Sequence, residues 1–314
     1  MLKKVVSVLL AITVLLACAA CGAPAEEAPA AVNTEAAQKE QQKEESVEEE
    51  VAEEENIKEE TAPEITFAEQ VLVDDENCTV KITGIEEDEI WGYTLKVYLE
   101  NKTDLELMFS VDGVSVNGYM CDPFWGSSVT AGMKSNEEIT FSKDAFERNG
   151  IVTPTDIQFN LRVSDYNDWM ADPLVEEEYT LYPMGEEAAQ TYEREDQAND
   201  NVLFDNEYCK MVVTGFEQDE IWGYTMNVYL ENKTDKELIF STDGVAVNGF
   251  MCDPFWGETV VAGKRCNTSI TWSDTAFEEN SITEVEEIVL PVRVSDNDDW
   301  MADPFVEDVF TVNP

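Results

Sequence analysis

The chain contains the same long segment twice. Residues 71–183 align with residues 202–314 at one constant offset and without a gap, and about 67 of about 113 aligned positions are identical. "DEIWGYTLKVYLENKTD" begins at Asp88, and "DEIWGYTMNVYLENKTD" begins at Asp219. A repeat of this length has the size of one compact domain. The sequence therefore predicts two modules, 66–183 and 202–314, joined by an acidic linker over 184–201.

Within each repeat, apolar residues recur at every second position. Leu95, Val97 and Leu99 alternate with Lys96, Tyr98 and Glu100, and the segment "DIQFNLRVSD" shows the same period. Period two is typical of strands that face a core on one side, and turn signals such as "NKTD" and "VNG" separate them. Ser142 in "SKDAFERNG" is a candidate N-cap of one short helix. We expect an all-β fold of two tandem immunoglobulin-like antiparallel β-sandwich modules, with an antiparallel barrel as the alternative.

The N-terminus reads as an export signal. Lys3 and Lys4 precede a short apolar run that ends in "LLACAACG". Such a run is too short to span a bilayer comfortably. It is similar to a bacterial lipobox, in which a cysteine after small residues receives lipid, and both Cys18 and Cys21 are candidates. We therefore predict a lipoprotein signal peptide over 1–21 and a lipid anchor on the extracytoplasmic face of a Gram-positive-like cell membrane.

The segment 22–65 is rich in Ala, Glu, Gln, Lys and Pro and nearly lacks aromatic residues, which predicts a disordered acidic tether. The whole chain has 68 acidic and 19 basic residues, for a net charge of −49. Nucleic acid is an unsuitable partner, because phosphate binding needs clustered Lys and Arg. Anionic headgroups would repel the modules too, so the N-terminal lipid is the expected membrane contact.

The chain has no histidine. This excludes Ser-His-Asp and Cys-His catalysis and His-ligated zinc. Carboxylate-pair chemistry of the glycosidase type is left, but acidic residues are so abundant that chance pairs carry no specificity. We expect no enzymatic activity and no cofactor, and keep a carboxylate-dependent hydrolase as a remote alternative.

Two segments carry a resemblance. "VSVNGYMCDPFW" followed by "AGMKSNEEITFS", and "VAVNGFMCDPFW" followed by "AGKRCNTSITWS", resemble an uncharacterised Ig-like domain of lipoproteins from clostridia and related Gram-positive bacteria. The resemblance covers both repeats and the layout of lipobox and acidic tether. It implies a fold class and a location at the cell surface. It implies no catalytic residues.

Four cysteines recur at matching positions. Cys78 and Cys121 of the first repeat correspond to Cys209 and Cys252 of the second. In an exported protein this predicts one disulfide in each module, with free core thiols as the alternative. Cys266 has no counterpart and is expected to be an unpaired thiol.

The acidic segments "SDYNDWMADP" and "SDNDDWMADP" are candidate Ca²⁺ sites, because hard carboxylate oxygens attract Ca²⁺. Their candidate ligands are Asp165, Asp168, Asp172, Asp296, Asp299 and Asp303. An EF-hand is excluded, because Trp and Met occupy positions that need an oxygen ligand and a glycine. The alternative is that these carboxylates cap backbone N–H groups of a turn.

Repeated aromatic residues near turns are the third candidate site. They are Trp91, Phe124, Trp125 and Trp169, which recur as Trp222, Phe255, Trp256 and Trp300. Exposed rings beside carboxylates suit a sugar- or peptide-binding platform, whereas buried rings would close the ends of the sandwich.

Together these patterns predict a membrane-anchored surface lipoprotein whose modules act as non-catalytic binding or spacer units of the adhesion type. Its partner would be a protein, a glycan or cell-wall material, and two copies on one tether would raise avidity. The alternative is a lipoprotein that binds a cation or small ligand for a transporter or cell-wall system.

Overall fold

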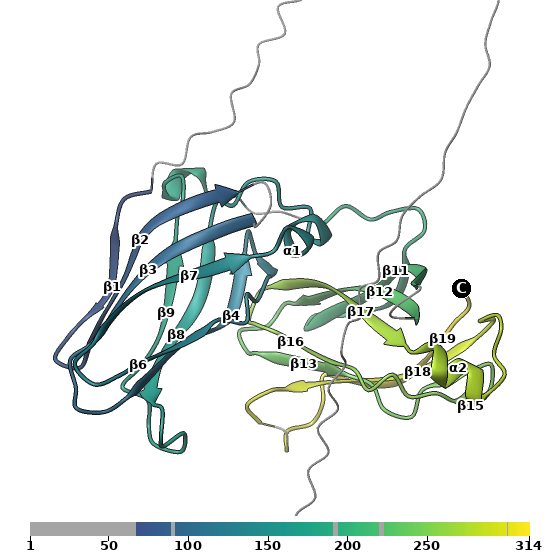
Figure 1. Cartoon of the computed structure of the whole chain (residues 1–314). Coiled ribbons are helices and arrows are strands. Elements are labelled where there is room, and N and C mark those ends of the chain that lie inside the picture. Colours follow the sequence, from purple (N-terminus) through teal and green to yellow (C-terminus); the bar gives the residue numbers. More distant parts are fainter. Residues whose placement is uncertain (1–66, 89–91, 191–193, 220–222, 300) are drawn as a thin grey trace, which may run out of the picture. The chain divides into compact units, whose positions relative to one another are not determined.

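The computed structural model describes residues 67–88, 92–190, 194–219, 223–299 and 301–314. The predicted signal peptide, both lipidation candidates Cys18 and Cys21, and the whole tether lie outside these residues. The described residues form an all-β structure of antiparallel sheets with few short helices (Figure 1), which confirms the all-β, sandwich-like class that the sequence predicts.

The first repeat contributes nine strands and one α-helix to the described residues. They are β1 (Gln70–Asp74), β2 (Cys78–Asp88), β3 (Gly92–Asn101), β4 (Leu107–Val116), β5 (Tyr119–Met120), β6 (Gly126–Val129), β7 (Lys134–Phe141), α1 (Lys143–Arg148), β8 (Ile157–Asp165) and β9 (Val175–Leu181). A single 3-10 turn, η1 (Glu186–Ala188), lies between the repeats in sequence.

The second repeat builds nearly the same series. Its elements are β10 (Asn201–Asp205), β11 (Cys209–Asp219), β12 (Gly223–Asn232), β13 (Leu238–Ser241), β14 (Ala246–Val247), β15 (Phe250–Met251), β16 (Gly257–Val260), β17 (Arg265–Trp272), α2 (Asp274–Glu279), β18 (Ile288–Asp296) and β19 (Val306–Val312).

In each repeat two layers of strands enclose a hydrophobic core, and the core of the first repeat also includes Val212 and Tyr229 of the second. In the first repeat, β1, β2, β3 and β7 pair in that order, and β4 pairs with β5, β6 and β8, which in turn pairs with β9. The alternating residues Leu95 and Val97 of β3 are buried against Phe109 of β4 and Leu161 of β8. The alternation of apolar residues predicted this arrangement, because period two places every second side chain on one face of a strand.

The strands of the second repeat pair in the same way. β10, β11, β12 and β17 form one layer, and β18 pairs with β13, β14 and β19 in the other. One difference concerns the strand that follows the "NKTD" turn. In the first repeat β4 runs unbroken across Gly113 with a shift of register, whereas in the second repeat β13 ends at Ser241 and β14 resumes at Ala246.

The predicted helix and its cap are present in both repeats. The Ser142 hydroxyl accepts a hydrogen bond from the Ala145 N–H at 3.2 Å, and the Ser273 hydroxyl accepts one from Ala276 at 3.4 Å. A serine at this position satisfies one of the N–H groups that the first helical turn leaves unpaired.

A buried asparagine closes the "NKTD" turn of each repeat. The Asn101 side-chain amide donates to the carbonyls of Leu105 at 2.7 Å and Val129 at 2.8 Å, and its oxygen accepts from the Thr103 N–H at 2.9 Å. Asn232 makes the same three contacts. This network fixes the backbone of the residues that follow the turn, Leu105 among them.

In the described residues, no helix has the length and apolar character needed to cross a membrane.

Candidate functional site

The loop "CDPFWG" between β5 and β6 presents a phenylalanine to solvent. Phe124 is 94% exposed. Its backbone φ is 50°, in the left-handed region that residues other than glycine rarely adopt. The Asp122 carboxylate accepts the Phe124 N–H at 2.7 Å, and Pro123 restricts the backbone between them. Burial raises the pKa of the Asp122 carboxyl above its usual value.

The second repeat places the matching residue in the same conformation. Phe255 is 100% exposed, its φ is also 50°, and the Asp253 carboxylate accepts its N–H at 3.3 Å. A left-handed backbone costs a residue with a Cβ roughly 1–2 kcal/mol. Nothing in the ring's own packing offsets this cost, because the ring contacts little besides solvent.

The tryptophan that follows behaves differently. Trp125 and Trp256 are partly buried and pack against the hydrophobic cores of their repeats. The Trp256 indole N–H is buried without a hydrogen-bond partner in the described residues. Phe124 and Phe255 therefore match the prediction of exposed rings that suit a binding platform. Trp125 and Trp256 match the prediction of buried rings that close the ends of the sandwich.

A second exposed group lies in the loop between β8 and β9. Trp169 is 80% exposed and Met170 is 77% exposed, and Met301 of the second repeat is 76% exposed. Trp91, Trp222 and Trp300 were also candidates, and they lie outside the described residues.

In the part of the chain that the structure describes, the carboxylates of these loops do not gather into a group of three possible metal ligands. Asp165 accepts the Asn167 N–H at 2.8 Å, and Asp168 accepts the Met170 N–H at 3.3 Å, so both cap turns. Asp172 does not join them. In the second repeat Asp296 and Asp299 cap the corresponding turns, and Asp303 stands apart from them. Among the described residues, no three Asp, Glu or Cys side chains converge as a metal site would require. Asp165, Asp168, Asp296 and Asp299 therefore match the alternative prediction of turn caps.

The prediction of one disulfide in each repeat is wrong for the described residues. Cys78, Cys121, Cys209 and Cys252 are buried free thiols, as is Cys266, which agrees with its prediction as an unpaired thiol. The reason lies in strand pairing. Cys78 pairs with Asn101 at one end of β3, whereas Cys121 lies by the end of α1, beside the Asn149 side chain.

The length of β3 separates these two ends. Helix α1 begins two residues after Phe141, and Phe141 pairs with Tyr93 of β3. Tyr93 lies at the opposite end of β3 from Asn101, eight residues away. At about 3.3 Å per residue the two ends are about 26 Å apart, far beyond the 7 Å limit between Cα atoms for a disulfide. Cys252 likewise contacts α2, where its thiol donates to the Ala276 carbonyl at 3.6 Å, while Cys209 pairs with Asn232.

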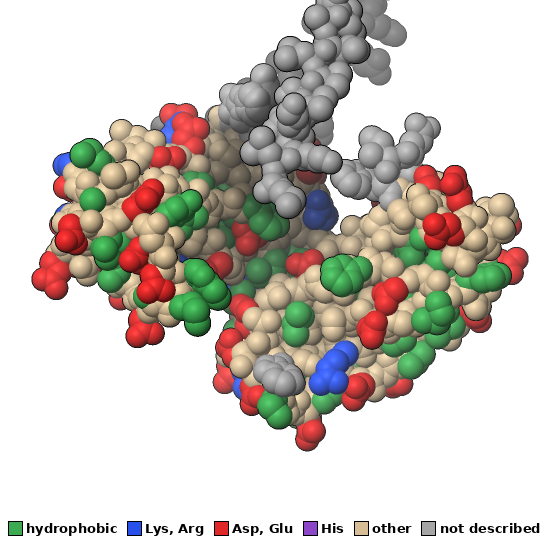
Figure 2. All heavy atoms as spheres, turned by 60° about the horizontal axis from the view of Figure 1, so that its bottom comes forward, with side chains coloured by type: hydrophobic (Ala, Val, Ile, Leu, Met, Phe, Trp, Pro, Cys, Tyr) green, Lys and Arg blue, Asp and Glu red, His purple; other side chains and the backbone are tan. Residues whose placement is uncertain are grey.

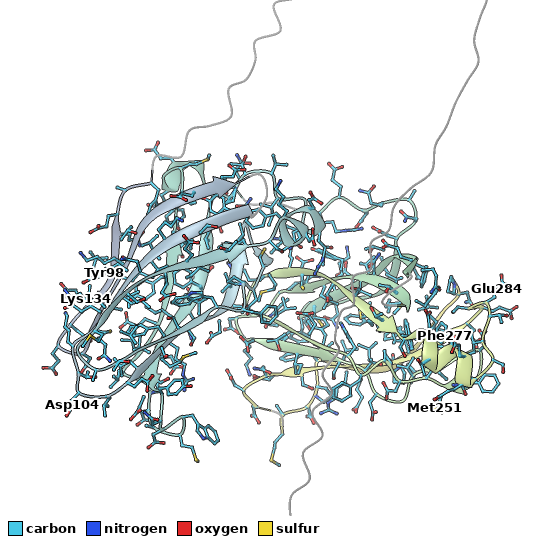
Figure 3. The ribbon with its side chains drawn as sticks, viewed as in Figure 1. Tyr98, Asp104, Lys134, Met251, Phe277 and Glu284 are labelled. Carbon is cyan, nitrogen blue, oxygen red and sulfur yellow. The ribbon has the colours of Figure 1, made fainter. Side chains whose placement is uncertain are left out.

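Sequence reasoning missed a groove in the second repeat. It has a volume of about 430 Å³ and lies beside α2, between Tyr224, Phe277, Ile282 and Val285. Figure 3 labels Phe277 and Glu284, which also line this region. Burial raises the pKa of the Tyr224 phenol. The lining combines these apolar side chains with the carboxylates of Asp274, Glu278 and Glu284.

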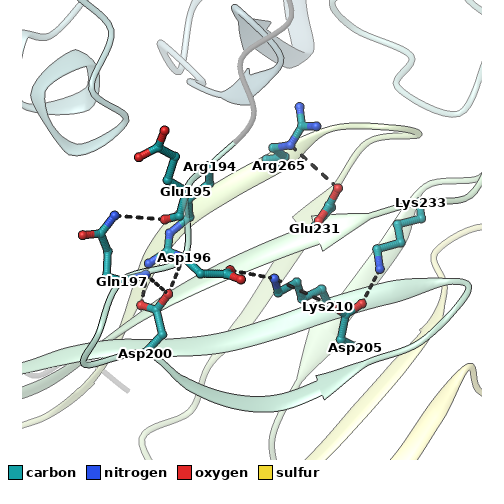
Figure 4. A network of polar contacts seen from close by, with 10 residues as sticks. All are labelled: Arg194, Glu195, Asp196, Gln197, Asp200, Asp205, Lys210, Glu231, Lys233 and Arg265. Carbon is teal, nitrogen blue, oxygen red and sulfur yellow. Dashed lines mark hydrogen bonds and ion pairs between the residues drawn. The ribbon is translucent and has the colours of Figure 1, made fainter.

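A cluster of basic side chains lies on the face of β11, β12 and β17 that also carries Val212 and Tyr229, which are buried with the core residues of the first repeat. The Arg194 guanidinium, from the predicted linker, lies 5.1 Å from the centre of the Tyr229 ring. It donates twice to Asp200, at 2.7 and 2.6 Å, and these hydrogen bonds lower the pKa of that carboxyl (Figure 4). Lys210 pairs with Asp196 at 3.2 Å in the same network.

The first repeat has a related but simpler arrangement. Lys81 and Lys134 each lie 5.9 Å from the centre of the Tyr98 ring, which is labelled in Figure 3 with Lys134. Lys81 also forms an ion pair with Glu69, and Lys134 forms one with Glu100. Neither cluster therefore offers an uncompensated positive charge for an anion. The second one attaches residues 194–200 to the second repeat.

Comparisons with known proteins give no family for this chain. No family model matches the sequence, and no curated protein matches it. Among solved structures, the chain is similar to red sea bream transglutaminase at 11% identity, with a TM-score of 0.19. The match covers 73% of this chain and 30% of the length of that protein. A similarity this low carries no argument about fold or function.

Proposed function

We propose that this chain is a lipid-anchored, extracytoplasmic binding protein without catalytic activity, in which two tandem Ig-like modules each present one exposed phenylalanine loop to a partner. The predicted resemblance to Ig-like lipoproteins of clostridia supports the location, and the two-layered cores of both repeats agree with the module type. The partner is a protein, a glycan or cell-wall material at the cell surface.

One observation carries this proposal. Phe124 and Phe255 are almost fully exposed and have the same left-handed backbone in both repeats. An unfavourable backbone conformation that is held by its surroundings is a marker of functional sites. An exposed aromatic ring on a fixed loop offers apolar contact at little cost in conformational entropy when a partner binds.

The duplication fits the same proposal. Two copies of a weak site on one chain bind a multivalent surface more tightly than either copy alone, because the second contact is intramolecular. The charge of −49 helps to keep neighbouring chains soluble and apart when they are held at high local concentration on a surface.

The experiment compares the full-length chain with four variants for binding to whole bacterial cells, to purified cell wall and to a glycan array. Phe124→Ala and Phe255→Ala should each weaken binding, and the double variant should abolish it. Val152→Ala is the matched control, because Val152 is an apolar residue of the first repeat that is 89% exposed outside the loop. Equal binding by the double variant and the wild type would refute the proposal.

The lipid anchor is tested separately by labelling cells with a radioactive fatty acid. If Cys18 carries the lipid, Cys18→Ala should not be labelled, and if Cys21 carries it, Cys21→Ala should not be labelled. Retention of the label in both variants would contradict the anchor.

A further inference from the structure

We propose that the loop tip of the first repeat is a docking surface for a basic polypeptide segment that also carries apolar side chains. The loop tip consists of Leu105, Tyr166, Trp169, Met170 and Leu174. The inference rests on the proposed role in binding and names the chemistry of one partner, at a surface separate from the phenylalanine loops.

These five side chains are unusually exposed for apolar residues. Their exposed fractions are 43% for Leu105, 54% for Tyr166, 80% for Trp169, 77% for Met170 and 38% for Leu174. Two segments bring them together: the Tyr166 N–H donates to the Glu106 carbonyl at 3.0 Å, so the turn after β3 lies against the loop after β8. Clustered exposed apolar groups of this kind mark interaction sites.

The loop tip is held in one conformation by its own hydrogen bonds. Asn101 fixes the Leu105 backbone, and the Leu174 N–H donates to the Val163 carbonyl at 2.7 Å. Between them, Asp165 and Asp168 cap successive turns. A preorganised apolar surface loses little entropy on binding, which favours a specific partner.

The charge around the loop tip selects the chemistry of that partner. Residues 103–106 and 164–174 contain five carboxylates and no Lys or Arg. Among the described residues, none of the ion pairs involves these carboxylates. Figure 2 shows the same character on one face of the molecule, where red carboxylates lie among green apolar side chains and blue ones are few. Lys and Arg of a partner would pair with the carboxylates and stack on the Tyr166 and Trp169 rings.

The second repeat supplies an internal contrast. Lys236 replaces Leu105 and forms an ion pair with Asp296. Asn297 replaces Tyr166, and its side-chain amide donates to the Glu237 carboxylate at 2.6 Å. The second repeat thus satisfies these carboxylates with its own side chains, whereas the first leaves the equivalent positions apolar and its carboxylates unneutralised.

A membrane or a second copy of the chain fits less well. The carboxylates would repel anionic headgroups, and they would equally repel another chain of the same charge. A basic segment with apolar side chains satisfies both features of the surface at once.

The experiment measures binding of the full-length chain by calorimetry to a synthetic peptide of alternating Lys and Leu, with a Lys/Ser peptide as the comparison. We expect the Lys/Leu peptide to bind more tightly, and the double variant Trp169→Ala, Met170→Ala to weaken it about tenfold or more. Val152→Ala should bind as the wild type does. Thermal melting should confirm that these exposed substitutions leave the fold intact.

An exchange between the repeats sharpens the test. Leu105→Lys with Tyr166→Asn gives the first repeat the residues of the second and should weaken binding. Lys236→Leu with Asn297→Tyr makes the opposite change and should add a second site.

Three results would overturn the proposal. Equal affinity for both peptides would show that the peptide is attracted by the net charge of the chain alone. An unchanged affinity of the double variant Trp169→Ala, Met170→Ala would show the same. If the full-length chain binds phosphatidylcholine vesicles, and the double variant Trp169→Ala, Met170→Ala loses that binding but keeps peptide binding, the surface is a membrane contact instead. The Phe124 and Phe255 variants should leave peptide binding unchanged, so failure here is distinguishable from failure of the proposed function.

Discussion

Replacing Phe255 by glycine should make the protein more stable, although it removes a large apolar side chain. Phe255 is 100% exposed, so its ring contributes almost nothing through burial. Its φ of 50° costs a residue with a Cβ roughly 1–2 kcal/mol, and glycine adopts this conformation freely. Against this gain, glycine adds conformational freedom to the unfolded chain, which costs roughly 0.4–1 kcal/mol.

The net expectation for Phe255→Gly is a gain in the free energy of unfolding of about 0.5–1 kcal/mol. For a domain of this size it corresponds to a rise in melting temperature of about 2–8 °C. Differential scanning calorimetry of the full-length chain measures the shift. Phe124→Gly should raise the melting temperature by a similar amount, because its geometry is the same.

Phe255→Ala separates the backbone from the ring. Alanine removes the ring but keeps the Cβ, so the left-handed conformation remains unfavourable and the melting temperature should hardly change. If alanine stabilises the protein as much as glycine does, or if both variants lower the melting temperature, the reasoning from backbone strain is refuted.

Three further changes test other parts of the structure. Asn101→Ala should lower the free energy of unfolding by about 2–4 kcal/mol in a urea titration, because it leaves the buried Val129 carbonyl without its donor; a loss below 1 kcal/mol would contradict this. Arg194→Gln should destabilise the protein at neutral pH. The lowered pKa of Asp200 means that the pair stabilises the fold above about pH 3.9 and stops doing so as the pH falls through the folded-state pKa, so the difference should vanish in acid melts. Burial raises the pKa of the Cys121 thiol to about 12, so native protein should not react there with Ellman's reagent at pH 8, and a reductant should leave the melting temperature unchanged.

The amino-acid sequence alone predicted the local structure well. The alternation of apolar residues at Leu95 and Val97 predicted which face of β3 is buried. The segment "SKDAFERNG" predicted a short helix capped by Ser142, which is α1. Both features depend on neighbours a few residues away in the chain, which are visible in the sequence. The duplication also reveals, in the sequence itself, which aromatic positions recur.

Long-range pairing decided the features that the sequence left open. Phe124 and Trp125 are adjacent and both aromatic, yet one is exposed and the other packs on the core, because the fixed turn after Asp122 points successive side chains in opposite directions. The distance between Cys78 and Cys121 depended on which ends of β3 they approach. A cysteine spacing in sequence carries no information about this register.

The repetition, the period of two and the excess of carboxylates therefore determined that this chain forms duplicated antiparallel layers with an acidic surface. Only the tertiary structure decided which side chains the layers leave in water, because burial is set by the strands that meet across the core rather than by the residue's own neighbours in the chain. Leu105 is exposed to solvent in the first repeat, whereas the equivalent Lys236 forms an ion pair with Asp296 in the second. This difference depends on the tertiary structure, which places each turn beside the loop after β8 or β18.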